Sequence, residues 1–138
     1  MSWFLVVLRK YATFSGRARR REYWAYILTS VFLLVLLLLI DMLTGTFDFE
    51  FLRGLLSSLF LLGNLLPALA VSVRRLHDTD RSGWWLLIGL LPPLVIGFLP
   101  PLLIALVPLI CTMVLFYFLI QEGDEGPNRH GPDPKSGR

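Results

Sequence analysis

The sequence predicts an all-α fold, a polytopic transmembrane helical bundle with three to four membrane segments and an N-terminal interfacial helix. Hydrophobic residues make up 55% of the 138 residues and charged residues only 17%, and the mean hydropathy is +0.66. An average soluble protein carries about 25% charged residues, and a small one leaves much of its surface in water. The apolar surplus therefore needs lipid, and residues 1–138 are expected to form one membrane domain.

Residues 2–14 predict a short helix at the membrane surface. Its apolar side chains recur at helical spacing and share one face: Trp3, Phe4, Val7, Leu8 and Tyr11. Aromatic side chains favour the headgroup region, which suits a helix lying in the membrane interface. The alternative is a short helix packed against the end of the bundle, and the two interpretations are compatible.

Two membrane-spanning helices are predicted in the first half of the chain. Residues 23–44 are almost entirely apolar, and a helix of that length extends about 33 Å, enough for a hydrocarbon core of about 30 Å. Residues 55–73 form a second segment in which small and polar residues interrupt the leucines, a composition that favours contact between helices. Asp41 lies near the end of the first segment, where we expect its carboxylate to reach water and have a structural or interfacial role.

The apolar stretch 84–120 is too long to cross the membrane once, because a single helix would extend about 55 Å. Proline pairs at 92–93 and 100–101 disfavour a continuous helix. We therefore divide the stretch into 84–99 and 102–120. The first part is short, so it is either a third crossing or a re-entrant arm, and four crossings in all are favoured over three. Glycine, proline and charge predict that the tail, 121–138, is extended and solvated.

The distribution of charge predicts the orientation. Residues 1–22 hold six basic side chains against Glu22, whereas the linker 45–54 has a net charge of −1. Basic residues flanking membrane helices favour the cytoplasmic side, which places the N-terminus in the cytoplasm and returns Arg74, Arg75 and Arg81 to it. The basic flank also fits contact with anionic lipid headgroups, and this use is favoured over nucleic-acid binding.

Few residues are candidates for chemistry. His77 and Asp78 lie side by side in the loop after the second segment, where an imidazole beside a carboxylate can act as a base, a metal ligand or a pH sensor. A zinc site needs three or four ligands, and His130, the only other histidine, lies in the tail. Cys111 is the only cysteine in the sequence, so the chain cannot form an intrachain disulfide. We therefore predict no catalytic, cofactor-binding or metal-binding residue.

Polar and aromatic residues beside the predicted segments form a candidate functional collar. Its members are Arg17, Arg20, Glu22, Trp24, Arg74, Arg75, His77, Asp78, Arg81, Trp84 and Trp85. The collar either binds anionic lipid or a partner, or sets the topology while Arg74 and Arg75 pair with Asp78 or Asp80 to brace the loop. The tryptophans are expected to anchor at the interface, with stacking on a ligand as the alternative.

Asn64 is the candidate polar contact inside the membrane, between Gly63 and Pro67 in the middle of the second segment. An amide in this position favours a hydrogen bond to a neighbouring helix, and contact with a transported substrate is the alternative.

Three polar stretches carry a resemblance: FSGRARRREYW at 14–24, VRRLHDTDRSGWW at 73–85 and GPNRHGPDP at 126–134. Together they resemble, nearly end to end, the signature stretches of the bacterial "domain of unknown function 805" family. The resemblance implies a small, multi-pass inner-membrane protein without an assigned activity. The chain differs from the family pattern at Asp80, where glycine is common, and at His130, where tyrosine is usual. Its apolar run after Trp85 also looks longer than in other members.

These observations favour a non-enzymatic scaffold or accessory subunit that binds partners or lipids, with a homo-oligomer as one form of partnership. The alternative is a small transporter or channel component, in which Asn64 and the proline-broken helices line a path. A membrane enzyme that uses His77 and Asp78 is a third hypothesis. No cofactor and no nucleic-acid partner is expected.

Overall fold

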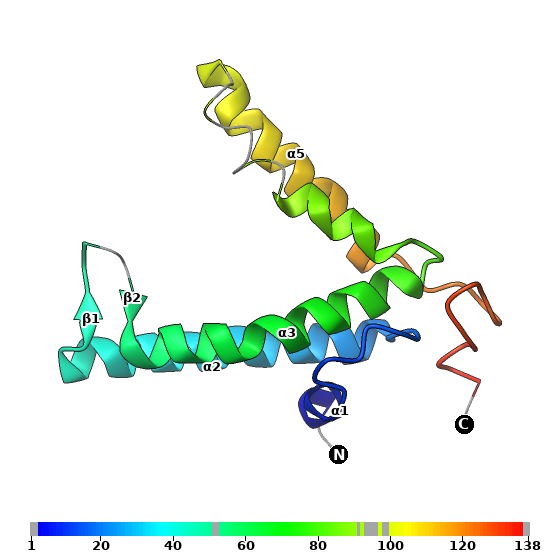
Figure 1. The fold of residues 1–138 in the computed structure, drawn as a ribbon, viewed down its shortest axis with the longest axis horizontal. Coiled ribbons are helices and arrows are strands. Elements are labelled where there is room, and N and C mark those ends of the chain that lie inside the picture. The colour runs from blue at the N-terminus through cyan, green and yellow to red at the C-terminus, as the bar shows by residue number, and fades with distance from the viewer. Residues whose placement is uncertain (1–2, 51–52, 91, 93–96, 98–99, 137–138) are drawn as a thin grey trace. The chain divides into compact units, whose positions relative to one another are not determined.

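In the computed structural model, the described residues, 3–50, 53–90, 92, 97 and 100–136, form mainly helices (Figure 1). The elements in chain order are α1 (Trp3–Arg9), α2 (Arg20–Thr44), β1 (Phe47–Asp48), β2 (Arg53–Gly54), α3 (Leu55–His77), the 3-10 helix η1 (Gly83–Leu90) and α5 (Pro101–Ile120). The chain divides into two compact units. The first unit comprises Met1–Thr13 and Arg21–Val71, and the second unit comprises Phe14–Arg20 and Ser72–Arg138.

In the first unit, α2 and α3 form an antiparallel pair (Figure 1). Near the start of α2, the Tyr26 hydroxyl donates a hydrogen bond to Asn64 Oδ1, and near its end Asp41 accepts one from the Ser57 amide. A residue later in α2 thus meets a residue earlier in α3, so the two helices are antiparallel. The connection includes a two-stranded antiparallel ladder of β1 and β2, in which Phe47 pairs with Gly54.

α1 is shorter than predicted, because it ends at Arg9 and the interfacial helix was expected to reach residue 14. The helix packs on the first unit through Val7, which is fully buried. The Phe4 ring stacks on Tyr26 with 5.4 Å between ring centroids, and Tyr11 donates a hydrogen bond of 2.6 Å to the Gly63 carbonyl. α1 therefore contacts the α2–α3 pair directly.

Asp41 does not reach water, contrary to the prediction, because its side chain is fully buried at the start of α3. Its carboxylate accepts hydrogen bonds from the amides of Leu56, at 3.0 Å, and Ser57, at 2.9 Å. Thr46 donates a third, at 2.8 Å. The first amides of a helix have no partner within the helix, so a carboxylate from α2 satisfies two of those of α3.

The second unit contains η1 and α5, which pack against each other in opposite directions. Near the start of η1, the Trp85 ring meets Phe118 edge to face, with 5.1 Å between centroids. Further along η1, Gly89 lies close to Leu115, one helical turn earlier in α5. α5 begins at Pro101, one residue before the predicted start, after Pro100 at its N-terminus. The first part of the predicted segment 84–99, up to residue 90, belongs to η1. The rest of the segment lies outside the described residues, except for residues 92 and 97.

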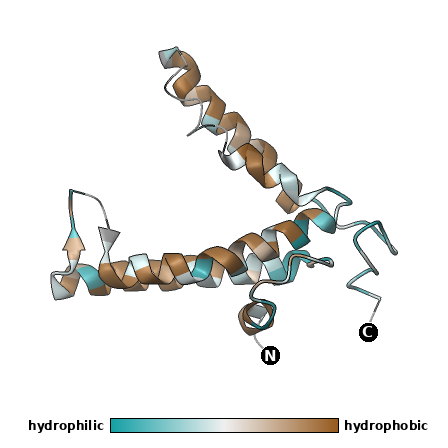
Figure 2. Cartoon of the chain, in the orientation of Figure 1, coloured by the Kyte–Doolittle hydropathy of each residue, from teal (hydrophilic) through white to brown (hydrophobic). Residues whose placement is uncertain are grey.

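Three helices are long and apolar enough to cross a membrane among the described residues: Arg20–Thr44, Leu55–His77 and Leu102–Ile120. Their mean hydropathies over 18 residues reach 2.6, 1.9 and 2.7. Figure 2 shows the hydrophobic colour along most of α2, α3 and α5, and large apolar side chains on all three are exposed. Because water would penalise such surfaces, they face lipid, and the predicted transmembrane helical fold is confirmed.

Candidate functional site

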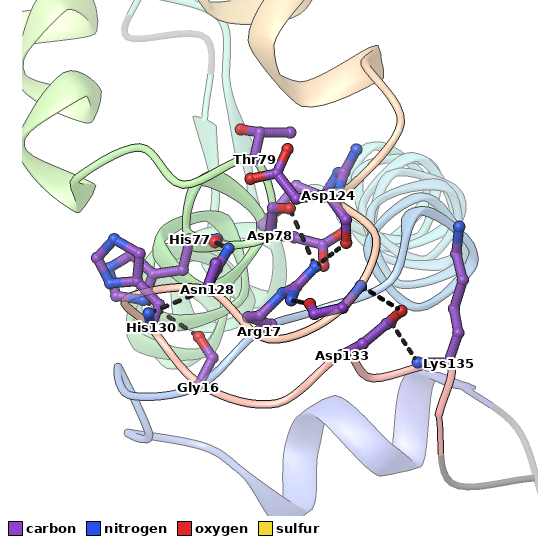
Figure 3. Close-up of polar contacts among 12 residues, drawn as sticks. Gly16, Arg17, His77, Asp78, Thr79, Asp124, Asn128, His130, Asp133 and Lys135 are labelled. Carbon is purple, nitrogen blue, oxygen red and sulfur yellow. Dashed lines mark hydrogen bonds and ion pairs between the residues drawn. The ribbon is translucent and has the colours of Figure 1, made fainter.

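The polar end of the second unit joins three segments that are distant in the sequence (Figure 3). They are residues 14–19 before α2, the end of α3 with the turn that follows it, and the tail after α5. The Ala18 amide donates a hydrogen bond of 2.9 Å to the Arg74 carbonyl, which fixes the first segment to α3. We call the buried ionic part of this junction, formed by Arg17, Arg75 and Asp78, the polar cluster.

Asp78 lies between the two arginines of the polar cluster. Arg17 Nε donates to Asp78 Oδ1 at 2.9 Å, and Arg75 Nη1 donates to Asp78 Oδ2 at 2.5 Å. The side chains of Arg17, Arg75 and Asp78 are 1%, 0% and 4% exposed. Burial raises the pKa of the Asp78 carboxyl, and the charges of Arg75 and Arg17 oppose that rise. Each carboxylate oxygen thus holds one guanidinium, an arrangement that compensates much of the cost of burying the charges.

Both arginines also donate to backbone carbonyls between residues 119 and 126. Arg17 Nη1 donates to the Gly126 carbonyl at 2.5 Å, and its Nη2 donates to the Asp124 carbonyl. Arg75 Nε donates to the Leu119 carbonyl at 3.1 Å, and its Nη2 donates to the carbonyl of Gln121. A cation beside the last carbonyls of α5 also complements the negative end of the helix dipole.

The tail is bound to the rest of the second unit, so the prediction of an extended, solvated end is wrong for its first part. The Asp124 amide donates a hydrogen bond of 2.8 Å to the Asp78 carbonyl. Gly123 lies so close to the Asp78 carboxylate that a Cβ at this position would overlap it. The Lys135 amide donates to Asp133 Oδ1, and the Gly126 amide donates to Asp133 Oδ2 at 3.2 Å. These hydrogen bonds lower the pKa of the Asp133 carboxyl. The glycines and prolines of the tail therefore shape bound turns.

His77 meets His130 of the tail, a contact that the prediction missed when it treated the two histidines as separate. The two imidazole rings stack with 3.9 Å between centroids and 5° between planes. His77 Nδ1 hydrogen-bonds the Gly16 carbonyl at 3.1 Å, as expected for a loop histidine bonded to backbone. Asn128 Nδ2 donates to the His77 carbonyl at 2.8 Å. No group of three or more histidine, cysteine, aspartate or glutamate residues suited to a metal ion occurs within the described part of the chain.

Asp80 holds the tail at the outer edge of the site. Its carboxylate accepts from Arg129 Nε at 2.9 Å and pairs with Nη2 at 2.8 Å, and these contacts lower the pKa of Asp80 and raise that of Arg129. The backbone of Asp80 has a positive φ of 52°. Glycine enters this region freely and aspartate tolerates it, so Asp80 fits this turn.

The other predicted collar residues have diverse surroundings. Arg20 pairs with Glu122 at 3.2 Å on an exposed surface, whereas Glu22 and Arg74 are buried. The guanidinium of Arg81 lies 4.3 Å from the centroid of the Phe118 ring, on which Trp85 also packs. The exposed Trp84 indole fits an interfacial anchor, and Trp24 meets Tyr23 edge to face. The structure thus unites Arg17, Arg75, His77 and Asp78 in one site and leaves Arg20 and Trp84 at the surface.

Asn64 lies apart from this site, in the first unit. Its side-chain oxygen accepts a hydrogen bond from the Tyr26 hydroxyl, so the amide links α3 to α2. This is the contact between helices that an amide in an apolar helix favours. The side chain is therefore engaged within the unit.

Sequence reasoning missed the tail residues that complete the site. They are Asp124, Asn128, Arg129, His130 and Asp133. Four of the five lie in the third polar stretch, 126–134, so that stretch already carried the signal. The stretch could not show which distant residues its side chains meet, because the contacts of Asp124, Asn128, Arg129 and His130 link residues 49 to 107 positions apart.

Comparison with known proteins decides the family. The family "Protein of unknown function (DUF805)" matches residues 11–132, which include the first two polar stretches and most of the third. The chain belongs to this family. Within it, the chain is 41% identical to the Escherichia coli inner membrane protein YhaI over 99% of this chain and 98% of that protein. It is also 41% identical to the inner membrane protein YhaH, over 98% of each chain.

A more distant relative is the uncharacterized Escherichia coli protein YiiR, 29% identical over 88% of this chain and 85% of that one. No solved structure matches the chain. Three apolar helices and two inner-membrane relatives of nearly the same length make this DUF805 member an integral inner-membrane protein in contact with the lipid bilayer. The names of these relatives assign no enzymatic or transport activity.

Proposed function

We propose that this DUF805 protein is a non-enzymatic membrane scaffold or accessory subunit. The observation that carries the proposal is the polar cluster, in which the charged groups bind one another and the chain's own backbone. Asp78 Oδ1 is bonded to Arg17 and Oδ2 to Arg75, and the side chain is only 4% exposed, so the carboxylate is closed to a substrate. The cluster therefore serves to join segments of the chain, which suits a protein that presents a defined surface.

His77 supports the same conclusion. One imidazole nitrogen is bonded to the Gly16 carbonyl and one ring face is covered by His130. The neighbouring Asp78 carboxylate binds two arginines instead of the His77 ring, so these two residues do not act as the acid–base pair that the enzyme hypothesis uses. These contacts favour the scaffold over an enzyme that uses His77 and Asp78.

The transport alternative loses its main support, because Asn64 binds Tyr26 of the adjacent helix. An amide that lined a substrate path would need a side-chain oxygen or nitrogen available to the solute. We therefore place the role of Asn64 in helix association.

The partner of the scaffold, in this proposal, includes the anionic headgroups of the bilayer. Arg17 and Arg75 are buried in the polar cluster and are unavailable to lipid. Arg9, Lys10, Arg20 and Arg21 carry exposed basic side chains, of which Arg20 also pairs with Glu122, and no acidic residue precedes Glu22. Each basic residue near an anionic membrane surface contributes about 1 kcal/mol to binding, so this group favours contact with headgroups.

We further propose that the N-terminus and the tail both lie in the cytoplasm, which requires four crossings. The end of α5 is bonded to Arg75, beside the segment of Arg17, so these parts share one membrane face. α5 has 20 residues and extends about 30 Å, which puts Pro101 at the opposite face. Gly83 lies against Val73 on the first face. The chain between Gly83 and Pro101 must then cross as well.

Native mass spectrometry of the purified chain, released from nanodiscs that contain phosphatidylglycerol, tests the scaffold. We expect ions heavier than the 15.7 kDa monomer that carry anionic lipid or a protein subunit. The double variant Arg20→Gln, Arg21→Gln should retain at least threefold less phosphatidylglycerol. Arg81→Gln is the matched control, because its guanidinium lies over Phe118 and it should retain lipid normally. A lipid-free monomer for the unmodified chain would refute the proposal.

A further inference from the structure

The stack of His77 and His130 joins the end of α3 to the tail. The ring centroids are 3.9 Å apart and the planes differ by 5°, so the rings lie face to face (Figure 3). Both side chains are only partly buried, so protons from the solvent reach them. This pair is a titratable contact between two segments 53 residues apart in the chain, and the scaffold proposed above does not use it.

The groups that face the stack come from the turn after α3, the segment before α2 and the tail. Asp80 faces His130, but its carboxylate is paired with Arg129 of the tail at 2.8 Å. This contact lowers the pKa of Asp80, so the ion pair is fully formed throughout the range in which histidine titrates. From the segment before α2, the stack meets the neutral Gly16 carbonyl, and Arg17 beside it is bound to Asp78. From the tail, Asn128 contributes a neutral amide.

We propose that the histidine stack is an acid-sensitive clasp that holds the end of the tail on α3 at neutral pH and releases it when both imidazoles are protonated. Two neutral rings pack face to face without charge. Two imidazolium ions at the same separation repel each other, and partial burial strengthens that repulsion. The hydrogen bond from His77 to Gly16 tolerates either state, since Nδ1 carries a proton in both.

The direction of the pH effect follows from proton binding. The bound tail opposes double protonation, so it takes up fewer protons than the released tail. Binding of the tail is therefore strongest above the ordinary histidine pKa of about 6.5 and weakens as the pH falls below it. Because one pKa unit corresponds to a tenfold change in an equilibrium, an effect of this kind weakens tail binding about tenfold at acidic pH.

Release is limited to the end of the tail. Arg17 holds Gly126 and Asp124 through bonds that do not titrate in this range. The part that moves is 127–136, because its ion pair between Arg129 and Asp80 is exposed and therefore weak, whereas the Arg17 side chain is buried. Acid would thus uncover the His77 ring and leave the polar cluster intact.

A nitroxide spin label at Ser136→Cys, in a Cys111→Ala background and in lipid nanodiscs, measures the clasp by electron paramagnetic resonance. Ser136 is exposed, and Cys111 is the only cysteine to remove. Between pH 8.0 and 5.5 we expect the ratio of immobile to mobile label to fall about tenfold. The matched variant His130→Tyr keeps an aromatic ring and removes the imidazole that titrates. In this variant the ratio of immobile to mobile label should change less than twofold.

A ratio of immobile to mobile label that does not change with pH when both histidines are present would overturn the clasp. An equal change of this ratio in His130→Tyr would overturn it as well. If that variant fails to bind its tail at any pH, carbon-13 NMR of labelled histidines decides. Protonation of both rings with the tail still bound would also refute the proposal. A scaffold without a clasp and a clasp without a scaffold are distinguishable, because the lipid retention described above does not depend on His130.

Discussion

Asp78 is the residue at which the three segments of the site meet. Its carboxylate binds Arg17 and Arg75, and its carbonyl accepts the Asp124 amide. Gly123 packs against the carboxylate with no space for a side chain. A single aspartate thus connects the segment before α2, the end of α3 and the tail.

Replacement of Asp78 by asparagine should destabilise the protein by about 3 kcal/mol, because two buried guanidiniums would lose their anion. Unfolding followed by tryptophan fluorescence in detergent measures the change. Glu122→Gln is the control: it removes the exposed partner of Arg20, whose pairing is worth less than about 0.5 kcal/mol. Equal effects of the two variants would show that burial of the pair has no energetic consequence.

Gly123→Ala should also destabilise, by about 2 kcal/mol, since the added methyl overlaps the Asp78 carboxylate and forces one of them to move. The matched substitution is Gly63→Ala in the middle of α3, where no atom lies within 4 Å of the added Cβ. There, alanine should stabilise by up to about 1 kcal/mol, because glycine is a poor helix former. Thermal unfolding of both variants tests the opposite signs, and a harmless Gly123→Ala would contradict the close approach.

Only part of this residue-level arrangement was predictable from the sequence. Arg75 and Asp78 are three positions apart at the end of a helix, a spacing that brings side chains together, and their pairing was one of those predicted. The Arg17–Asp78 pair joins residues 61 positions apart, and local spacing contains no information on such a contact. His77 and His130 escaped prediction for the same reason.

At the scale of elements, the start of α3 and the end of α5 are each fixed by a charged side chain from another helix. Asp41 of α2 binds the first amides of α3, and Arg75 of α3 binds the last carbonyls of α5. Each charge has the sign that complements the helix end it meets. In an apolar environment, these contacts replace the water that would otherwise satisfy the helix ends.

Asp41→Asn should lower Tm by about 5 °C. Asparagine loses the negative charge and keeps only one oxygen, its amide oxygen, to accept from the amides of Leu56 and Ser57. Circular dichroism melts in detergent measure the change in Tm. Asp48→Asn in β1 is the control, since this exposed carboxylate bonds the nearby Glu50 amide at the surface and its loss should change Tm by less than about 1 °C. A Tm unchanged by Asp41→Asn would argue against its role at the start of α3.

Hydropathy predicted the long helices well and the short ones poorly. Spans expected at 23–44 and 102–120 are observed as α2 and α5, and α3 begins at the predicted residue 55 and extends four residues past 73. The extension carries arginines, which a hydropathy criterion assigns to a loop but which burial against the tail retains in the helix. The 3-10 form of η1 follows no periodicity in the sequence, because its residues are apolar on every side.

That 3-10 form affects how a short segment can cross a membrane. A 3-10 helix rises about 2.0 Å per residue against 1.5 Å for an α-helix. The eight residues of η1 therefore cover about 16 Å, where an α-helix would cover about 12 Å. The eight residues of η1 can therefore cover more of the membrane thickness than the same number of residues in an α-helix.

For the whole molecule, the bond between the end of α5 and Arg75 links the position of the tail to that of the basic segment before α2. Paired reporter fusions after Arg138 test this directly, with alkaline phosphatase active only outside the cytoplasm and green fluorescent protein fluorescent only within it. We expect a fluorescent, phosphatase-negative tail, because the four crossings proposed above would return it to the side of the N-terminus. Fusion after Glu50, between α2 and α3, is the matched control and should give the reverse pattern. A phosphatase-active tail would require an odd number of crossings, and neither the four-crossing topology nor a cytoplasmic polar cluster would then hold.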